Sequence, residues 1–166
     1  MQAELYWIAD VHRGRLAIMP RPRAGDWLAD ELASLHSSGV DILVSLLTDE
    51  EIAELDLEHE PSECQKLRLS FITYPINDRE VPSSIENFLN LTNYLDKRLR
   101  DGDSIAIHCR MGIGRSSLLA ASLLVKSGLS TADAFISISR ARGIDVPDTV
   151  MQVDWVESIQ ERLRNN

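Results

Sequence analysis

The stretch that decides the fold runs from Ile105 to Ala121 and reads IAIHCRMGIGRSSLLAA. An apolar run, Ile105–Ile107, leads into a polar and glycine-containing segment, and a second apolar run begins at Leu118. This order predicts a strand, a loop and the first turn of a helix. Because a helix N-terminus presents unpaired N–H groups and the positive end of the helix dipole, the loop is expected to bind an anion.

The residue types inside the loop predict a reactive thiolate beside that anion. Gly112 and Gly114 let the backbone fold back, so that successive amides can point inward and form a concave nest. Cys109 lies below the nest, where a helix N-terminus and a nearby cation favour the thiolate over the thiol. Arg115 adds a planar guanidinium that can hold two phosphate oxygens at once.

The loop resembles the signature His-Cys-x-x-Gly-x-Gly-Arg-Ser/Thr of cysteine-dependent protein phosphatases. Within that superfamily the chain is most similar to the small atypical dual-specificity phosphatases, such as those like the cyclin-dependent-kinase-associated phosphatase. The resemblance implies that Cys109 attacks phosphorus and becomes a cysteinyl phosphate, while Arg115 holds the equatorial oxygens. It implies that Ser116 hydrogen-bonds the departing thiolate, and that His108 orients the loop and tunes the thiol.

The resemblance also assigns the rest of the loop to phosphate binding. The residues concerned, besides His108, are Arg110, Met111, Gly112, Ile113 and Gly114. Arg110 could in addition favour a second phosphate or an acidic flank on the substrate, so an inositol phospholipid stays open as a substrate. The alternative for this side chain is a surface arginine that pairs with a nearby carboxylate.

A second segment offers the acid that expulsion of an alkoxide requires. Residues 75–82 read PINDREVP, and they resemble the Pro-Ile-x-Asp-x-x-x-Pro acid loop of some small dual-specificity phosphatases. Asp78 is therefore expected to protonate the leaving oxygen and then to activate water, which typically contributes ~10²–10⁴ in rate. The alternative is that Asp78 only caps a turn, and Glu80 is the next candidate for the acid.

Three further residues have weaker assignments. Gln152 lies where related phosphatases carry a Thr-x-x-Gln, so it is expected to contact the phosphate loop or the hydrolytic water, with a solvent-facing helix position as the alternative. Asp148 replaces an uncharged residue of that segment. Cys64 lies in a polar stretch and could form a disulfide with oxidised Cys109, although nothing in the sequence brings the two together.

Composition sets the remaining limits. A chain of 166 residues suits one domain, 1–166, with a hydrophobic core large enough to be stable without disulfides or bound metals. The net charge of −9 argues against nucleic acid as a partner. Only two cysteines and scattered histidines indicate neither a disulfide framework nor a metal, and no cofactor is expected. The N-terminus does not read as a signal peptide, and no apolar run reaches the length of a membrane span. Because a nucleophilic thiolate needs a reducing compartment, a cytoplasmic location is expected.

Apolar periodicity predicts an α/β fold. A small and mostly parallel sheet is expected between helices on both faces, with a helical C-terminal third. The expected strands are 5–8, 15–18, 40–47, 67–74 and 104–107, the first two as a hairpin. Helices are expected near 27–38, 48–54, 61–65, 83–101, 115–127, 130–142 and 149–163. Their predicted caps include capping boxes at Thr48 and Ser83, Ser130 or Thr131, and Asp148 or Thr149.

These observations favour a phosphomonoester hydrolase that acts on phosphotyrosine and phosphoserine or phosphothreonine in proteins. Phosphorylated proteins are thus the expected partners, and the oligomeric state is open. Two rival interpretations remain. A rhodanese-like sulfurtransferase or arsenate reductase also uses cysteine and arginine in an anion loop, but lacks the Gly-x-Gly-Arg-Ser ending. A catalytically silent phosphopeptide-binding module would need neither Cys109 nor Asp78.

Overall fold

A computed structural model describes residues 2–166 of the chain. Its centre is a five-stranded sheet with the strand order β1-β2-β5-β3-β4. The strands are β1 (Tyr6–Val11), β2 (Gly14–Met19), β3 (Ile42–Ser45), β4 (Ser70–Thr73) and β5 (Ile105–His108). The strand β1 pairs with β2 in antiparallel fashion, and all other pairs are parallel. The predicted hairpin and the predicted, mostly parallel sheet are therefore both confirmed.

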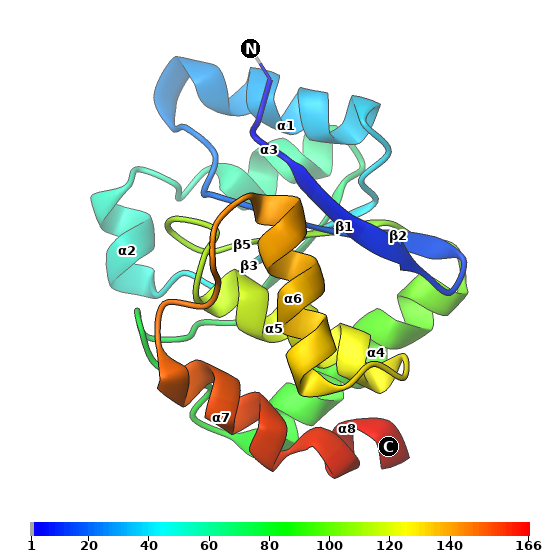
Figure 1. Cartoon of the computed structure of the whole chain (residues 1–166). Helices are drawn as coiled ribbons and strands as arrows, with labels where there is room; N and C mark the ends of the chain where they lie inside the picture. The colour runs from blue at the N-terminus through cyan, green and yellow to red at the C-terminus, as the bar shows by residue number, and fades with distance from the viewer. Residues whose placement is uncertain (1) are drawn as a thin grey trace.

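Helices cover both faces of this sheet. They are α1 (Leu28–Ser37), α2 (Asp49–Glu54), α3 (Glu60–Lys66), α4 (Ile85–Arg100), α5 (Arg115–Lys126), α6 (Thr131–Arg142), α7 (Val150–Ser158) and α8 (Gln160–Asn165), and a short 3-10 turn, Gly25–Trp27, precedes α1. Figure 1 shows α1 and α3 on one side of the strands and α4 to α8 on the other. Two apolar clusters fill the spaces between these layers, one on each face.

The parallel strands carry the functional loops to one edge of the sheet. Ser45 of β3 and Met19 of β2 lie level with His108 at the end of β5. Open sheets of parallel strands bind their ligands outside these carboxyl ends. The loop after β5, the acid segment after β4 and the helix α2 after β3 all begin at that edge.

Helix α5 is buried on every side. All residues from Arg115 to Val125 are buried, and α4, α6, α7 and α8 all contact it. A helix that is apolar around its whole circumference belongs in a core. This burial matters for function, because the first turn of α5 ends the predicted anion loop. No helix among residues 2–166 combines the length and the apolar character that a membrane crossing needs.

Several helix ends agree with the sequence. Thr48 forms the predicted capping box with Glu51, and both Ser130 and Thr149 cap their helices through their side chains. The other predicted box is wrong by one residue: Ser84, not Ser83, caps α4 through the amide of Asn87. Ser83 directly follows a proline and stays outside the helix, so α4 starts one position later than predicted.

Two other expectations need correction. The helix predicted from 149 to 163 is divided into α7 and α8, because the backbone leaves helical geometry at Ile159. The sequence places Trp27 at a core-like spacing, but this residue lies in the 3-10 turn and is 50% exposed. The Arg23 guanidinium lies over its ring instead.

Candidate active site

The predicted strand, loop and helix form as expected around Cys109. The strand β5 ends at His108, and α5 begins at Arg115 with its N-terminus at the loop. Cys109 is 2% exposed, and its Sγ atom lies 3.4 Å from the Ser116 hydroxyl oxygen. The hydroxyl is therefore within hydrogen-bonding distance of the sulfur, the position that the resemblance assigns to Ser116.

The carbonyl groups at the start of the loop point away from the anion nest. The Cys109 carbonyl oxygen lies 3.2 Å from Nδ1 of His108. The next carbonyl, that of Arg110, accepts a hydrogen bond of 3.2 Å from the amide of Arg21 in the segment after β2. Because a trans peptide is planar, the N–H that follows each carbonyl points the opposite way.

Arg142 holds the next two carbonyls. From the end of α6 its guanidinium donates to the carbonyl oxygens of Met111 at 3.2 Å and Gly112 at 3.1 Å. Although Arg142 lies near the exposed end of a polar helix segment, its guanidinium is thus bound to the loop. Four successive carbonyls are held outside the loop, so the four amides that follow them, those of residues 110–113, point inward. The amides of residues 110–114 have no protein acceptor among residues 2–166. They are available to an anion.

Both loop glycines are required, for different reasons. Gly112 has a φ of +69°, and a Cβ atom there would lie 2.6 Å from the Met19 carbonyl carbon. Gly114 has an ordinary φ of −86°, but a Cβ atom would lie 2.3 Å from a carboxylate oxygen of Asp148. This Cβ atom would also lie 3.1 Å from the side-chain nitrogen Nε2 of Gln152. The start of α7 therefore packs directly on the loop.

Arg115 is held from three directions although it is only 1% exposed. Its Nη1 and Nη2 atoms donate to the two carboxylate oxygens of Glu51 at 2.7 and 2.9 Å, and Nη1 also donates to the Ile76 carbonyl. Burial raises the pKa of Glu51, but the hydrogen bonds from Arg115, the Thr48 amide and Arg110 outweigh it and hold that pKa at about 2. Glu51 therefore stays ionised and fixes the guanidinium plane.

Asp78 lies over the same arginine. Its carboxylate oxygen is 3.2 Å from Nη2 of Arg115, whereas its side chain is 54% exposed. The acid segment and the phosphate loop thus meet at one guanidinium, although 36 residues (79–114) lie between Asp78 and Arg115 in the sequence. A carboxylate at this place can reach a group bound to the loop and can also reach water.

The Arg110 side chain does not face an open anion site. Its guanidinium contacts Glu51 at 3.4 Å and Glu54 at 3.1 Å. Both carboxylates belong to α2, and their hydrogen bonds raise the pKa of Arg110 above its ordinary value. The sequence leaves open whether Arg110 binds a second phosphate or pairs with a nearby carboxylate. In the structure it pairs with carboxylates.

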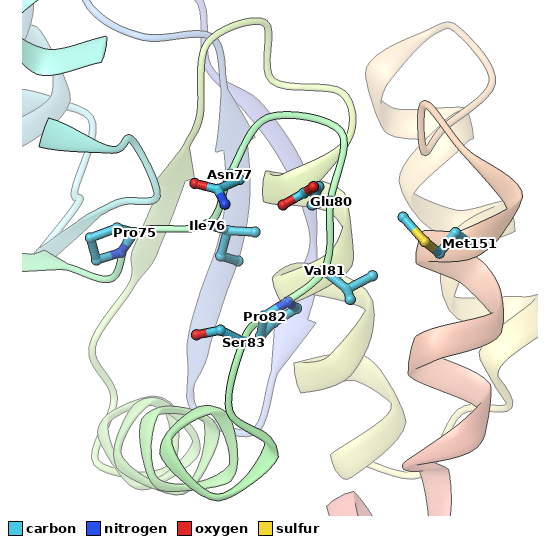
Figure 2. Close-up of a pocket in the computed structure, with 8 residues that line it drawn as sticks. All are labelled: Pro75, Ile76, Asn77, Glu80, Val81, Pro82, Ser83 and Met151. Carbon is cyan, nitrogen blue, oxygen red and sulfur yellow. The ribbon is translucent and has the colours of Figure 1, made fainter. Parts of the chain in front are cut away.

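Gln152 is buried beside the loop rather than turned to solvent. It is 0% exposed, its Nε2 atom donates to the Glu80 carbonyl at 3.2 Å, and its Oε1 atom has no partner among the described residues. Next to it, a groove of about 380 Å³ lies between the acid segment and α7. Figure 2 shows residues of the acid segment along one wall of this groove, from Pro75 to Asn77 and from Glu80 to Ser83, with Met151 of α7 opposite Val81.

His108 has a buried partner that the sequence did not reveal. Its Nε2 atom lies 2.7 Å from a carboxylate oxygen of Glu60, and the two side chains are 0% and 1% exposed. Glu60 is the first residue of α3, on the opposite face of the sheet from α5. The stretch around it is acidic and weakly patterned, so no local signal marks this carboxylate.

Cys64 lies in the apolar cluster on the α1 and α3 face, whereas Cys109 belongs to the cluster on the other face. Burial, together with the charges of Glu60 and Glu63, raises the pKa of the Cys64 thiol to about 12. A neutral and buried thiol is a poor redox partner. Across residues 2–166, no three histidine, cysteine, aspartate or glutamate side chains gather as metal ligands.

Solved structures define the class of fold. The kinase-associated phosphatase, in a form with its catalytic cysteine replaced by serine, superposes over 100% of this chain and 98% of its own, with a TM-score of 0.89 and 20% identity. Tk-PTP in its active form is 28% identical and matches 95% of this chain and 97% of its own, with a TM-score of 0.76. The fold is that of the small cysteine-dependent phosphatases.

The family model described as polymorphic toxin system, DSP-PTPase phosphatase, matches residues 17–129. The chain therefore belongs to this family of dual-specificity and tyrosine phosphatases. A viral protein named as a tyrosine phosphatase, 197R of Invertebrate iridescent virus 6, is 44% identical over 57 residues. That match covers 32% of this chain and only 21% of the viral protein.

Proposed function

We propose that this chain hydrolyses phosphomonoesters through a cysteinyl phosphate on Cys109, and that it acts on phosphotyrosine and on phosphoserine or phosphothreonine in proteins. One observation carries the proposal. The Cys109 sulfur lies 3.4 Å from the Ser116 hydroxyl, below a loop whose amides 110–114 have no protein acceptor among the described residues. Such a nest binds the phosphoryl oxygens and leaves phosphorus facing the sulfur.

In the first step, the Cys109 thiolate attacks phosphorus. A P–S bond forms, the P–O bond to the alcohol breaks, and Asp78 gives its proton to the leaving oxygen. Arg115 and the loop amides stabilise the charge on the three equatorial oxygens. The Glu51 carboxylate supports this step, because it fixes the plane of the guanidinium with two hydrogen bonds.

In the second step, water attacks the cysteinyl phosphate. The Asp78 carboxylate takes a proton from the water, the P–S bond breaks and inorganic phosphate leaves. Ser116 donates its hydroxyl hydrogen to the departing thiolate, and the buried Gln152 beside the loop helps to place the water. His108 orients the start of the loop, while Met111, Gly112, Ile113 and Gly114 contribute their amides.

The proposed substrate class is phosphorylated protein rather than inositol phospholipid. The Arg110 guanidinium is neutralised by two carboxylates of α2, so it is a poor site for a second phosphate. Tk-PTP and the viral relative carry names of tyrosine phosphatases, which agrees with this class. We further propose that residues 1–166 act as one phosphatase domain. Since Cys64 and Cys109 are both free thiols, we propose that the protein acts in a reducing compartment such as the cytoplasm.

Replacement of the nucleophile tests the proposal. Cys109→Ser should abolish hydrolysis of p-nitrophenyl phosphate and of phosphotyrosine peptides, while the melting temperature and the circular dichroism spectrum stay close to native. Cys64→Ala is the matched control, because it removes the other thiol and should retain full activity. Full activity of Cys109→Ser would end the proposal.

The same assays separate the rival interpretations. Thiosulfate:cyanide transfer without phosphatase activity would indicate a sulfurtransferase. Phosphopeptide binding by the native protein without release of inorganic phosphate would indicate a binding module. A substrate-trapping pull-down with Cys109→Ser from a lysate then identifies the phosphorylated protein, and phosphoinositide release assays decide whether lipids are also hydrolysed.

A further inference from the structure

Glu60 has no part in the reaction steps proposed above, yet it is paired with His108, which adjoins the nucleophile. Nε2 of His108 and a carboxylate oxygen of Glu60 lie 2.7 Å apart, and both side chains are excluded from solvent. Buried ionisable groups are costly unless they are paired and hydrogen-bonded. The position of this buried pair beside Cys109 therefore suggests a functional role.

Both ring nitrogens of His108 face acceptors. Nδ1 lies 3.2 Å from the Cys109 carbonyl oxygen, which can only accept, so Nδ1 carries a proton. Nε2 faces the Glu60 carboxyl group. One shared proton joins these two groups, and the ring is hydrogen-bonded at both nitrogens.

We propose that Glu60 is a positioning residue for the nucleophile: it holds His108 as an imidazolium that donates from both ring nitrogens, and His108 in turn holds the Cys109 carbonyl out of the anion nest. The planar trans peptide then points the Arg110 N–H in the opposite direction, toward the bound phosphate. Glu60 thereby sets the first amide of the loop from the far face of the sheet. This inference rests on the proposed function, because it explains how the same site is made ready.

A merely structural pair would act differently. It would only attach α3 to β5, and its loss would lower stability without a particular effect on the ring or on Cys109. The two roles are therefore distinguished by the protonation of His108 and by the dependence of the Glu60 effect on His108. Glu63, on the same helix and paired at the surface with Lys66, offers the matched control.

The first test is the ¹⁵N spectrum of the imidazole rings in the native protein and in Glu60→Gln. Native His108 should show two protonated ring nitrogens with slowly exchanging hydrogens. Glu60→Gln should show one, on Nδ1, because the amide can donate to Nε2. Glu63→Gln should match native. A single protonated nitrogen in native His108, or two in Glu60→Gln, would overturn the proposal, and the native spectrum alone decides even where the variant does not fold.

The second test is kinetic. Glu60→Gln should lower kcat for p-nitrophenyl phosphate about tenfold with little change in KM, which is less than the ~10²–10³ lost when a donor to the reacting group is removed directly. It should also slow alkylation of Cys109 by iodoacetamide severalfold. In a His108→Asn background, Glu60→Gln should change kcat less than twofold, because Glu60 acts only through the ring.

If Glu60→Gln lowers kcat equally in the native and in the His108→Asn background, the contact between Glu60 and His108 is only structural. The alkylation rate and the ring signals do not depend on turnover. If the native protein hydrolyses no phosphate ester, the proposed function fails, while these two measurements still decide whether Glu60 positions Cys109.

Discussion

The phosphate loop, 108–116, and the acid segment, 75–82, meet at Arg115 but are held in opposite ways. In the loop, four successive carbonyls are hydrogen-bonded to His108, Arg21 and Arg142, and Cys109 and Arg115 are buried. In the acid segment, Asp78 is 54% exposed and its carboxylate contacts Arg115 alone among the cations of the described residues.

The difference follows from what each segment does. Amides that stabilise charge in a transition state are effective only when they need no reorganisation, so the loop is held rigidly. An acid that first gives and then takes a proton must reach both the leaving group and water, so Asp78 stays exposed. We therefore expect substitutions in the loop to change both stability and rate, and substitutions of Asp78 to change the rate alone.

Among substitutions that leave the nucleophile in place, Asp78→Asn should have the largest effect on rate. Hydrolysis of a phosphoserine peptide should fall by ~10²–10⁴, because an alkoxide needs a proton to leave. p-Nitrophenyl phosphate, with its good leaving group, should lose far less, and the melting temperature should stay native. The kcat/KM values of both substrates are compared with those of Asp101→Asn, a turn residue at the other end of the sheet. Equal losses on both substrates would move the acid elsewhere.

Gly112→Ala should damage the loop itself. The positive φ costs about 1–2 kcal/mol for an alanine, and overpacking against the Met19 backbone costs about 1–3 kcal/mol more. Thermal unfolding and phosphatase kinetics measure the loss. Gly25→Ala is the matched control, since Gly25 has a φ of +66° but a Cβ atom there would have nothing within 4 Å. If the two variants lose equal stability, the close approach contributes nothing.

Glu51→Gln should reveal the charge behind Arg115. The pKa of Glu51 lies near 2, below its ordinary value of 4.5, so its stabilising contribution is complete above pH 4.5 and is lost as the pH falls through about 2. At pH 7 the variant should lose about 1.5–3 kcal/mol, the range for a hydrogen bond to a charged group. Melting curves from pH 7 to pH 2.5 should show this gap closing. The variant Glu50→Gln, at the neighbouring position, should be as stable as the native protein at every pH. A loss of stability in Glu51→Gln that does not change with pH would contradict the assignment.

Arg142→Gln should have the smallest effect. Two carbonyl contacts are lost from the outer part of the loop, while His108 and Arg21 still hold the inner part. We expect a loss of about 1 kcal/mol in transition-state stabilisation, or roughly fivefold in kcat/KM. Arg140→Gln, an exposed change on the same helix, should leave kcat/KM unchanged. An unaffected Arg142→Gln would show that the inner contacts suffice.

Much of the fold could be predicted because its signals are local. The Thr48 capping box and the Ser130 cap need only residues within one turn, and both are confirmed. The position of Ser84 as the α4 cap and the break at Ile159 were missed. The pattern of side-chain types does not mark either of these two positions.

The candidate site divides along the same line. Cys109, Arg115 and Asp78 are named by their motifs, and the structure brings all three together, although their roles stay predictions. Glu51 and Glu60 carry no motif of their own. They are recognisable only once α2 and α3 have been placed beside the carboxyl edge of β5.

Short-range patterns predict the strand, loop and helix around Cys109, the identity of the anion-binding groups and the α/β class, because those properties depend on residues within a few positions of one another. How the groups are held is visible only in the folded chain: Glu51 pairs with Arg115, Glu60 with His108, Arg142 with the loop carbonyls, and Arg110 with carboxylates of α2. Hydrogen bonds between residues 30 to 64 positions apart form only after the sheet and the helices that cover it have assembled.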